Sequence, residues 1–581
     1  MSSISYCVPG TFEENRFEKL HNVPFNSPQA GSIAVADEIA SLIRKKQAKN
    51  EMCVLGLATG SSPITVYKRL IELHKSEGLS FKNVITFNLD EYFGLDTSDI
   101  NSYHLFMHDN LFDHIDILPE NIHIPSGELP LDQVREYCVD YEEKIIAAGG
   151  IDLQLLGIGR TGHVGFNEPG SNINSQTRLV SLDHLTRLDA AEAFQGLDNV
   201  PRKAISMGIK TILSARRIIL LAWGTNKSEI IQRAIEGEVN PNVPSTYLQK
   251  HENTTVVLDH QAASDLIRVK TPWITGNCNW EDDTIRFRAV HWLCQKTKKS
   301  ILKLTEEDYN LNGMSELLIV EGNYYDLNIK MFKRLQNTIT GWPGGKPHSE
   351  DQNRPERALP NKKRCIIFSP HPDDDVISMG GTFDRLVTQG HEVHVAYQTS
   401  GNIAVSDEEA LKYIEVMIDV ESDSNSYEEL RLEILNKNKN QIDSTPLRNL
   451  KSAIRKRESL AATRYLGIPD SQVHFLNLPF YETGKVQKNN PSKKDFLITN
   501  DLISLIKPHQ IYAAGDLADP HGTHRICLNI LFESLGQLKK EAYVKDCWVW
   551  LYRGAWQEFD VHEIEMAVPM SPDQVMRKRK A

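Results

Sequence analysis

The chain has 581 residues, of which 40% are hydrophobic and 24% are charged, and its formal net charge is −12. A single core stops growing at about 250–300 residues, so we expect two or three domains. The acidic balance argues against nucleic acid or a membrane surface as the main partner. No apolar run is long enough to predict a membrane span, and the N-terminus lacks the pattern of a secretory signal. The eight cysteines include no Cys-x-x-Cys pair, which predicts reduced thiols and a cytoplasmic protein.

The first half of the chain alternates between apolar strand-like segments and helical patterns. Four segments are typical of buried strands: "CVLGLATG" (53–60), "NVITFNLDEY" (83–92), "IDLQLLGIG" (151–159) and "RRIILLAWG" (216–224). This alternation predicts an α/β fold with a doubly wound, mainly parallel sheet. Ligands of such sheets bind outside the carboxyl ends of the strands, and the candidate residues of this half all follow such ends.

A turn of small residues, "GLATGSSP" (56–63), lies between the first of these strands and a helix. Backbone N–H groups at such a turn can hold an anion, and the hydroxyls add donors. The candidate phosphate-binding residues are Thr59, Gly60, Ser61 and Ser62. An ordinary tight strand–helix turn remains the alternative.

Two acids, Asp90 and Glu91, directly follow the second strand. A carboxylate there can take a proton from a carbon next to a carbonyl group. The alternative for Asp90 is a structural one, the N-cap of a following helix.

The segment "GIGRTGHVGFNEPGS" (157–171) follows the third strand and carries His163 and Glu168. The glycines at 159 and 162 would let the backbone come close to a ligand. Thr161 is unexpected, because a carboxylate at this position would serve a catalytic histidine better than a neutral hydroxyl.

Together these segments resemble the glucosamine-6-phosphate deaminase family from about residue 30 to 270. The resemblance implies conversion of glucosamine 6-phosphate to fructose 6-phosphate and ammonia without a metal or redox cofactor. It also implies that Asp90 moves the proton between C2 and C1, and that His163 opens the sugar ring with Glu168. The 59–62 turn and Lys227 of "WGTNKSE" would hold the phosphate. The family's tendency to form oligomers implies a homo-oligomer.

The chain departs from the family pattern at two positions. Thr161 stands where the family usually has an aspartate that orients the histidine, a loss that could cost orders of magnitude in rate. Glu192 stands near the usual place of a phosphate-binding arginine, and Arg187 or Lys227 could compensate.

Beyond residue 270 we expect three further parts. Residues 271–340 are mostly helical in pattern and would form an extension that packs on the first domain, which spans 1–270. Residues 341–363 are rich in proline, glycine and charge and predict a polar linker. A second α/β domain would span 364–581, with a charged surface insertion at 405–450.

The second domain carries two polar motifs after predicted strands, "RCIIFSPHPDDDVISMGG" (364–381) and "IYAAGDLADPHGTHRICL" (511–528). Histidines and aspartates at two parallel strand ends suit an open zinc site. The candidate ligands are His371, Asp374 and His524, with Asp373 as the base that deprotonates water and His521 as the group that steadies the oxyanion. The structural alternative is that the aspartates cap a helix and the histidines are incidental.

These motifs, with "RKRESLAATRYLGI" (455–468), resemble the PIG-L/LmbE-like zinc-dependent N-deacetylases. The resemblance implies removal of acetyl groups from N-acetylglucosaminyl compounds. Asp375 stands where that family more often has glutamate, and the chain stops before a further helix that the family usually has, so part of the pocket wall could be missing.

Two hypotheses remain, of which the first is our expectation and the second the alternative. In the first, the second domain deacetylates an N-acetylated amino sugar and the first deaminates a phosphorylated amino sugar. In the second, an active deacetylase is joined to a catalytically impaired, sugar-phosphate binding domain.

Overall fold

The computed structural model describes residues 16–581 except 192, 195, 277, 348–355, 357–358, 421–424, 438–440, 485–487, 518 and 520–521. The chain folds into two compact units, Met1–Asn279 and Trp280–Ala581. Each has its own parallel sheet, so the predicted pair of doubly wound α/β domains is confirmed.

Unit 1 is built on a seven-stranded sheet in which every neighbouring pair is parallel. Its strands, in spatial order, are β1 (His21–Phe25), β10 (Thr254–Asp259), β9 (Ile218–Ala222), β6 (Leu153–Gly157), β2 (Cys53–Leu57), β3 (Val84–Asn88) and β5 (Ile122–His123). The four strands predicted from sequence are the four neighbours at the centre, β9, β6, β2 and β3. Their carboxyl ends therefore lie side by side.

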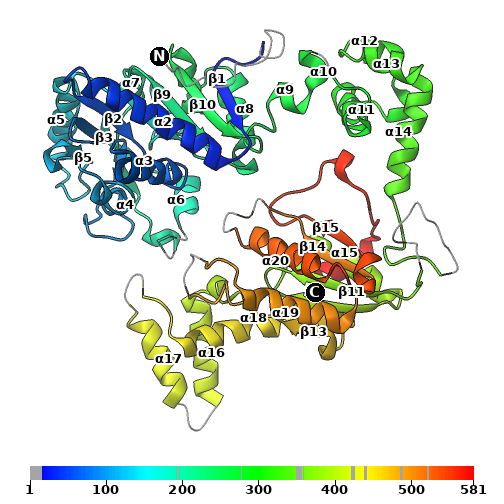
Figure 1. Ribbon diagram of the computed structural model, residues 1–581. Helices are drawn as coiled ribbons and strands as arrows, with labels where there is room; N and C mark the ends of the chain where they lie inside the picture. Colours follow the sequence, from blue (N-terminus) through cyan, green and yellow to red (C-terminus); the bar gives the residue numbers. More distant parts are fainter. Residues whose placement is uncertain are drawn as a thin grey trace. The chain divides into compact units, whose positions relative to one another are not determined.

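Helices cover both faces of this sheet (Figure 1). The helices of unit 1 are α2 (Pro28–Gln47), α3 (Ile64–Glu77), α4 (Tyr103–Asn110), α5 (Val134–Ala147), α6 (His184–Ala190), α7 (Ile209–Leu213), α8 (Ser228–Glu236), α9 (Ile267–Lys270) and α10 (Pro272–Thr275). Successive strand residues point to opposite faces, so Leu55 joins the core under α2 and α3 while Val54 joins the core under α5, α7 and α8. Two apolar cores result, one on each side of the sheet.

A small antiparallel sheet lies beside the carboxyl end of β3. It consists of β4 (Asp90–Tyr92), β8 (Lys203–Ser206) and β7 (Arg178–Ser181). Asp90 pairs with Ser206 in this sheet. The two acids after β3 are therefore held on a strand and not on a mobile loop.

Unit 2 begins with a helical extension. Its helices are α11 (Asp283–Thr297), α12 (Glu306–Asn310), α13 (Ser315–Glu321) and α14 (Tyr324–Thr338). We expected it to pack on the first domain, but from Trp280 onward it belongs to the second unit. Backbone bonds explain the difference, because Thr340 N donates to Ala567 O and Ala567 N donates to Thr338 O.

The sheet of unit 2 has five parallel strands: β13 (Val473–Phe475), β12 (Glu392–Tyr397), β11 (Arg364–Ser369), β14 (Gln510–Ala514) and β15 (Trp548–Tyr552). The remaining helices are α15 (Asp374–Thr388), α16 (Asp407–Val420), α17 (Asn425–Leu435), α18 (Thr445–Leu466), α19 (Lys493–Ile506), α20 (Thr523–Leu538), α21 (Ala542–Lys545) and α22 (Pro572–Lys580). Apolar residues of α15 and α18 form the core on one face, and those of α19 and α20 form the core on the other.

The predicted insertion is a helical pair, α16 and α17, drawn yellow in Figure 1. It packs on the start of α18 through a small core of its own that includes Ala410, Ile414 and Leu447. Lys451, only 4% exposed, bonds to Asp407 and Asp443 and ties the pair to α18.

The predicted linker is partly built into unit 2. Pro343 O accepts bonds from Gln510 Nε2 and from the Tyr512 hydroxyl, and Gly341 O accepts a bond from Arg385. Glu356 and Lys363 are buried, although the composition of the segment suggested little burial. Polar residues can be buried when they are bonded, which composition alone does not predict.

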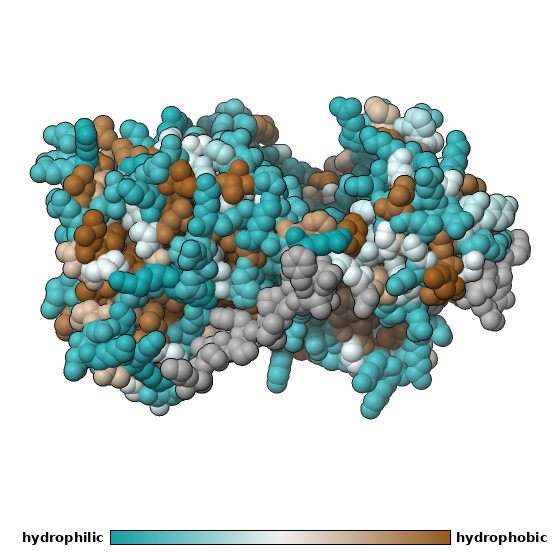
Figure 2. Space-filling view, turned by 90° about the horizontal axis from the view of Figure 1, so that it is seen from above, coloured by the Kyte–Doolittle hydropathy of each residue, from teal (hydrophilic) through white to brown (hydrophobic). Residues whose placement is uncertain are grey.

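In the part of the chain that the structure describes, every helix is too short or too polar to cross a membrane. Hydrophilic side chains cover much of the face shown in Figure 2, with the apolar ones in small groups between them.

Candidate active sites

The first site begins with Asp90, the first residue of β4. Asp90 is 5% exposed, and its burial together with the charge of Glu91 raises its pKa to about 8. The N-cap alternative is wrong for Asp90, because this residue belongs to a strand. A carboxyl whose pKa lies near neutrality can gain and lose a proton during turnover.

Glu91 has the structural role instead. Its carboxylate accepts bonds from the N–H groups of Tyr92, Tyr103 and His104, and the last two begin α4. Burial raises its pKa to about 7 in spite of these bonds. A carboxylate at a helix N-terminus is stabilising, so Glu91 fixes α4 against β4.

His163 is held by three groups on one ring nitrogen. Nδ1 lies 2.9 Å from Thr161 Oγ1, 3.2 Å from Glu168 Oε2 and 3.3 Å from Thr186 Oγ1. Burial alone would raise the pKa of Glu168, but the hydrogen bond and charge of His163 lead the contacts that hold this pKa below its ordinary value. An ionised carboxylate therefore faces Nδ1 although residue 161 is a threonine, and Nε2 makes no hydrogen bond among the described residues.

The glycines of this segment make room for the protein's own side chains. A Cβ on Gly159 would lie 2.1 Å from the His163 ring, and one on Gly162 would lie 2.6 Å from Val243. Gly162 also has a φ of +81°. Gly159 makes room for the His163 ring and Gly162 for the core residue Val243. The sequence alone does not show which side chains pack against these glycines.

The candidate phosphate residues lie at the ends of two strands. The 59–62 turn follows β2, and Lys227 follows β9. Trp223 Nε1 donates to Ser62 O, which joins the two segments. Gly60 has a φ of +92°, as a tight turn before a helix requires.

Of the two cations expected to compensate for Glu192, Arg187 is already in use. Its guanidinium donates to Leu197 O and Val200 O and closes the loop after α6. Glu192 itself lies outside the described residues. Lys227 remains available for a phosphate.

The second site brings His371, Asp374 and His524 together, with their ligand atoms all within 4.8 Å of one another. β11 and β14 are neighbours in the sheet, so the segments that follow them meet at one edge. Asp374 Oδ2 lies 3.3 Å from His371 Nδ1 and 3.2 Å from His524 Nε2. Burial would raise the pKa of Asp374, yet hydrogen bonds from His371 and His524 hold it well below its ordinary range.

This group fits a metal ion by its donor set and by one unsatisfied atom. His524 is 1% exposed, and its Nδ1 has no hydrogen-bond partner among the described residues. A buried polar atom without a partner is costly unless something unseen satisfies it. Two imidazoles and a carboxylate suit zinc with an open fourth position.

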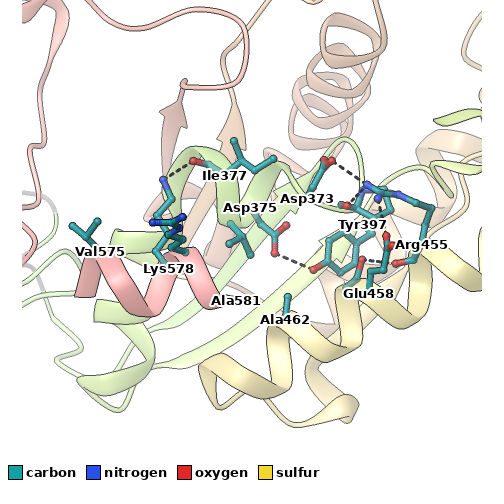
Figure 3. Close-up of a pocket in the computed structure, with 14 residues that line it drawn as sticks. Asp373, Asp375, Ile377, Tyr397, Arg455, Glu458, Ala462, Val575, Lys578 and Ala581 are labelled. Carbon is teal, nitrogen blue, oxygen red and sulfur yellow. Dashed lines mark hydrogen bonds and ion pairs between the residues drawn. The ribbon is translucent and has the colours of Figure 1, made fainter. Parts of the chain in front are cut away.

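Asp373 points into a cavity of about 540 Å³ beside this group (Figure 3). Arg455 of α18 donates to Asp373 Oδ2 at 2.9 Å and to Pro372 O at 2.5 Å. Deeper in the cavity the Tyr397 hydroxyl donates to Asp375, whose pKa is raised to about 7 by burial. The wall opposite α18 is α22, where Lys578 donates to Ile377 O.

Two of these features went beyond our sequence prediction. We matched the segment 455–468 of α18, which begins with Arg455, but assigned no role to the arginine, although its spacing from Glu458 places both on one helix face. We expected part of the pocket wall to be missing, and α22 lines one side of this cavity. His521 lies outside the described residues, so its role stays a prediction.

Comparison with known proteins gives the same two parts. The family described as glucosamine-6-phosphate isomerases/6-phosphogluconolactonase matches residues 26–257, and the family described as GlcNAc-PI de-N-acetylase matches residues 366–535. A Bacteroides thetaiotaomicron protein named putative glucosamine-6-phosphate deaminase-like protein is 48% identical over 590 residues, covering 99% of this chain and 89% of that protein. The chain belongs to the glucosamine-6-phosphate deaminase-like family. Both resemblances found in the sequence are thereby confirmed.

Other relatives match a smaller part of this deaminase-like chain, about as long as the deaminase family match in unit 1. The glucosamine-6-phosphate deaminase of Thermoanaerobacter sp. is 46% identical over 230 residues, which cover 40% of this chain and 90% of that enzyme. Glucosamine-6-phosphate deaminase 1 of Bacillus subtilis is 47% identical over 211 residues, which cover 36% of this chain and 86% of that enzyme. A solved structure described as a monomeric glucosamine-6-phosphate deaminase is 43% identical, covers 42% of this chain and all of its own, and has a TM-score of 0.41.

Proposed function

We propose that unit 1 is a working deaminase, which converts glucosamine 6-phosphate and water to fructose 6-phosphate and ammonia. The observation that carries this proposal is the 3.2 Å contact between Glu168 and His163 Nδ1, which supplies the carboxylate that Thr161 lacks. A threonine alone could not stabilise a positively charged imidazole, whereas an adjacent carboxylate can.

The residues divide the reaction between them. Ionised Asp90 takes the proton from C2 and returns it to C1, a task that suits a carboxyl with a pKa of about 8. His163 exchanges a proton with the ring oxygen through Nε2, while Glu168 and Thr161 hold Nδ1. Lys227 and the 59–62 turn bind the phosphate and so fix the sugar for both steps.

The relative weight of Glu168 and Thr161 gives a direct test. Glu168→Gln is expected to lower kcat for ammonia release by about 100-fold or more, since it removes the charge that stabilises protonated His163. Thr161→Ala is expected to cost only a few-fold, because Glu168 and Thr186 remain on Nδ1. Steady-state assays of ammonia release measure kcat for both variants, and their melting temperatures show whether each is folded. A larger loss in the threonine variant would contradict the proposal.

We propose further that unit 2 is a zinc-dependent deacetylase of N-acetylated amino sugars. His371, Asp374 and His524 would hold the zinc ion, which when bound supplies a Lewis acid and lowers the pKa of water. Asp373 would take up the proton of the attacking water, and its salt bridge with Arg455 orients this carboxylate. His521 would steady the oxyanion. The free amine that deacetylation leaves is the group that a deaminase removes.

We also propose a cytoplasmic homo-oligomer, on the basis of the cysteine pattern and the family's tendency to assemble. Light scattering of the purified chain tests the assembly, and a monomer at micromolar concentration would contradict it.

A further inference from the structure

A salt bridge lies next to the candidate phosphate site. Arg160, which follows β6, donates from Nε to Asp189 Oδ2 at 3.0 Å, and a second contact joins Nη2 to Oδ1. Both side chains are nearly half exposed, at 45% and 44%. An exposed pair of this kind contributes little to stability, so its partner can be exchanged at low cost.

Lys227 lies within electrostatic reach of this pair. Burial lowers the pKa of Lys227, Asp189 raises it and Arg160 lowers it further. Its ammonium has no hydrogen bond or ion pair among the described residues, although the side chain is half-buried. A partly desolvated cation without a partner favours an anion in the space beside it.

The sheet brings these groups to one place. β6 and β9 are paired neighbours, with Gly157 opposite Leu221, so the turns that carry Arg160 and Lys227 leave the same edge. Trp223 binds the 59–62 turn to the end of β9. Arg187, the arginine of this region that the sequence suggested, donates instead to backbone carbonyls, and from the sequence we assigned no role to Arg160.

We propose that Arg160 and Lys227 together form the binding site for the substrate's phosphate. Asp189 holds Arg160 in a salt bridge until the phosphate replaces it. This inference rests on the proposed deaminase function, of which it names a specificity-determining residue. Arg160 offers planar, bidentate donors that match phosphate as well as carboxylate. Phosphate carries more charge than Asp189 and gains a second cation, Lys227, so the exchange is favourable.

The test uses the full-length protein and four variants: Arg160→Ala, Arg160→Lys, Asp189→Asn and, as a matched control, Arg202→Ala. Arg202 is an exposed arginine of the same unit, and its side chain makes no hydrogen bond or ion pair among the described residues. For each we would measure kcat and KM for glucosamine 6-phosphate, and the Kd of fructose 6-phosphate by calorimetry. The calorimetric measurement needs no turnover.

Arg160→Ala is expected to raise KM and Kd by about 10-fold or more while kcat changes little, since a charge-assisted contact is lost. Arg160→Lys should recover part of the loss, and Asp189→Asn should lower both constants several-fold by removing the competitor. Constants for Arg160→Ala no different from those for Arg202→Ala would overturn the inference. If Arg160→Ala weakens fructose 6-phosphate binding but the native protein releases no ammonia, the phosphate-binding site is supported and the deaminase function is rejected.

Discussion

Asp90→Asn is expected to abolish ammonia release and, at the same time, to stabilise unit 1 at alkaline pH. Loss of a positioned general base costs about 100- to 10,000-fold in rate. Asparagine keeps the shape of the side chain and can still accept the backbone bond from Phe166, but it cannot take a proton. The wild-type rate should rise with pH up to about 8, where Asp90 becomes ionised.

The stability change follows from the raised pKa of Asp90. Between its ordinary value of 3.8 and about 8, the folded protein holds a proton that the unfolded chain releases. The free energy of unfolding therefore falls as pH rises through this window, and the penalty is largest above pH 8. The asparagine variant has no such penalty, so its gain in melting temperature should be larger at pH 8.5 than at pH 5.5. An equal gain at both values would show that the Asp90 carboxyl is not perturbed.

The second large effect concerns the metal group of unit 2. Replacing His524 with alanine is expected to reduce bound zinc from about one ion per chain to almost none, because one of three protein ligands is lost. Acetate release from N-acetylglucosamine 6-phosphate should disappear with it. Elemental analysis after desalting measures the metal, and a chromatographic acetate assay measures the activity.

His394→Gln provides the control for this experiment. His394 lies on β12 and bonds to His474, so its loss should leave zinc content unchanged. Ammonia release by unit 1 should survive in both variants, which separates the two activities. Full zinc content in His524→Ala would contradict the assignment of this residue as a ligand.

The sequence predicted the two sheets and the residues that gather at their edges. Apolar runs such as "RRIILLAWG" (216–224) are recognisable because both faces of a parallel strand are buried, and strand order then brings Asp90, His163 and Lys227 to neighbouring ends. The same logic placed His371 and Asp374 near His524. Motif residues at strand ends are thus the part of a site that a single sequence reveals best.

Contacts between distant side chains were beyond the sequence. The sequence of residues 157–171 does not show that the Glu168 carboxylate contacts His163 Nδ1, or that Gly159 makes room for the His163 ring. Arg187 looked available for phosphate until its bonds to backbone carbonyls were seen. The helical extension was assigned to the wrong neighbour, because apolar periodicity shows that a helix packs but not on what.

Steady-state ammonia release from glucosamine 6-phosphate by the purified protein, with Asp90→Asn as control, is the measurement that tests the central claim most directly. The account predicts sustained release by the native protein and none by the variant, despite Thr161. No release by the folded native protein would show that Glu168 does not replace the missing aspartate, and that unit 1 only binds a sugar phosphate.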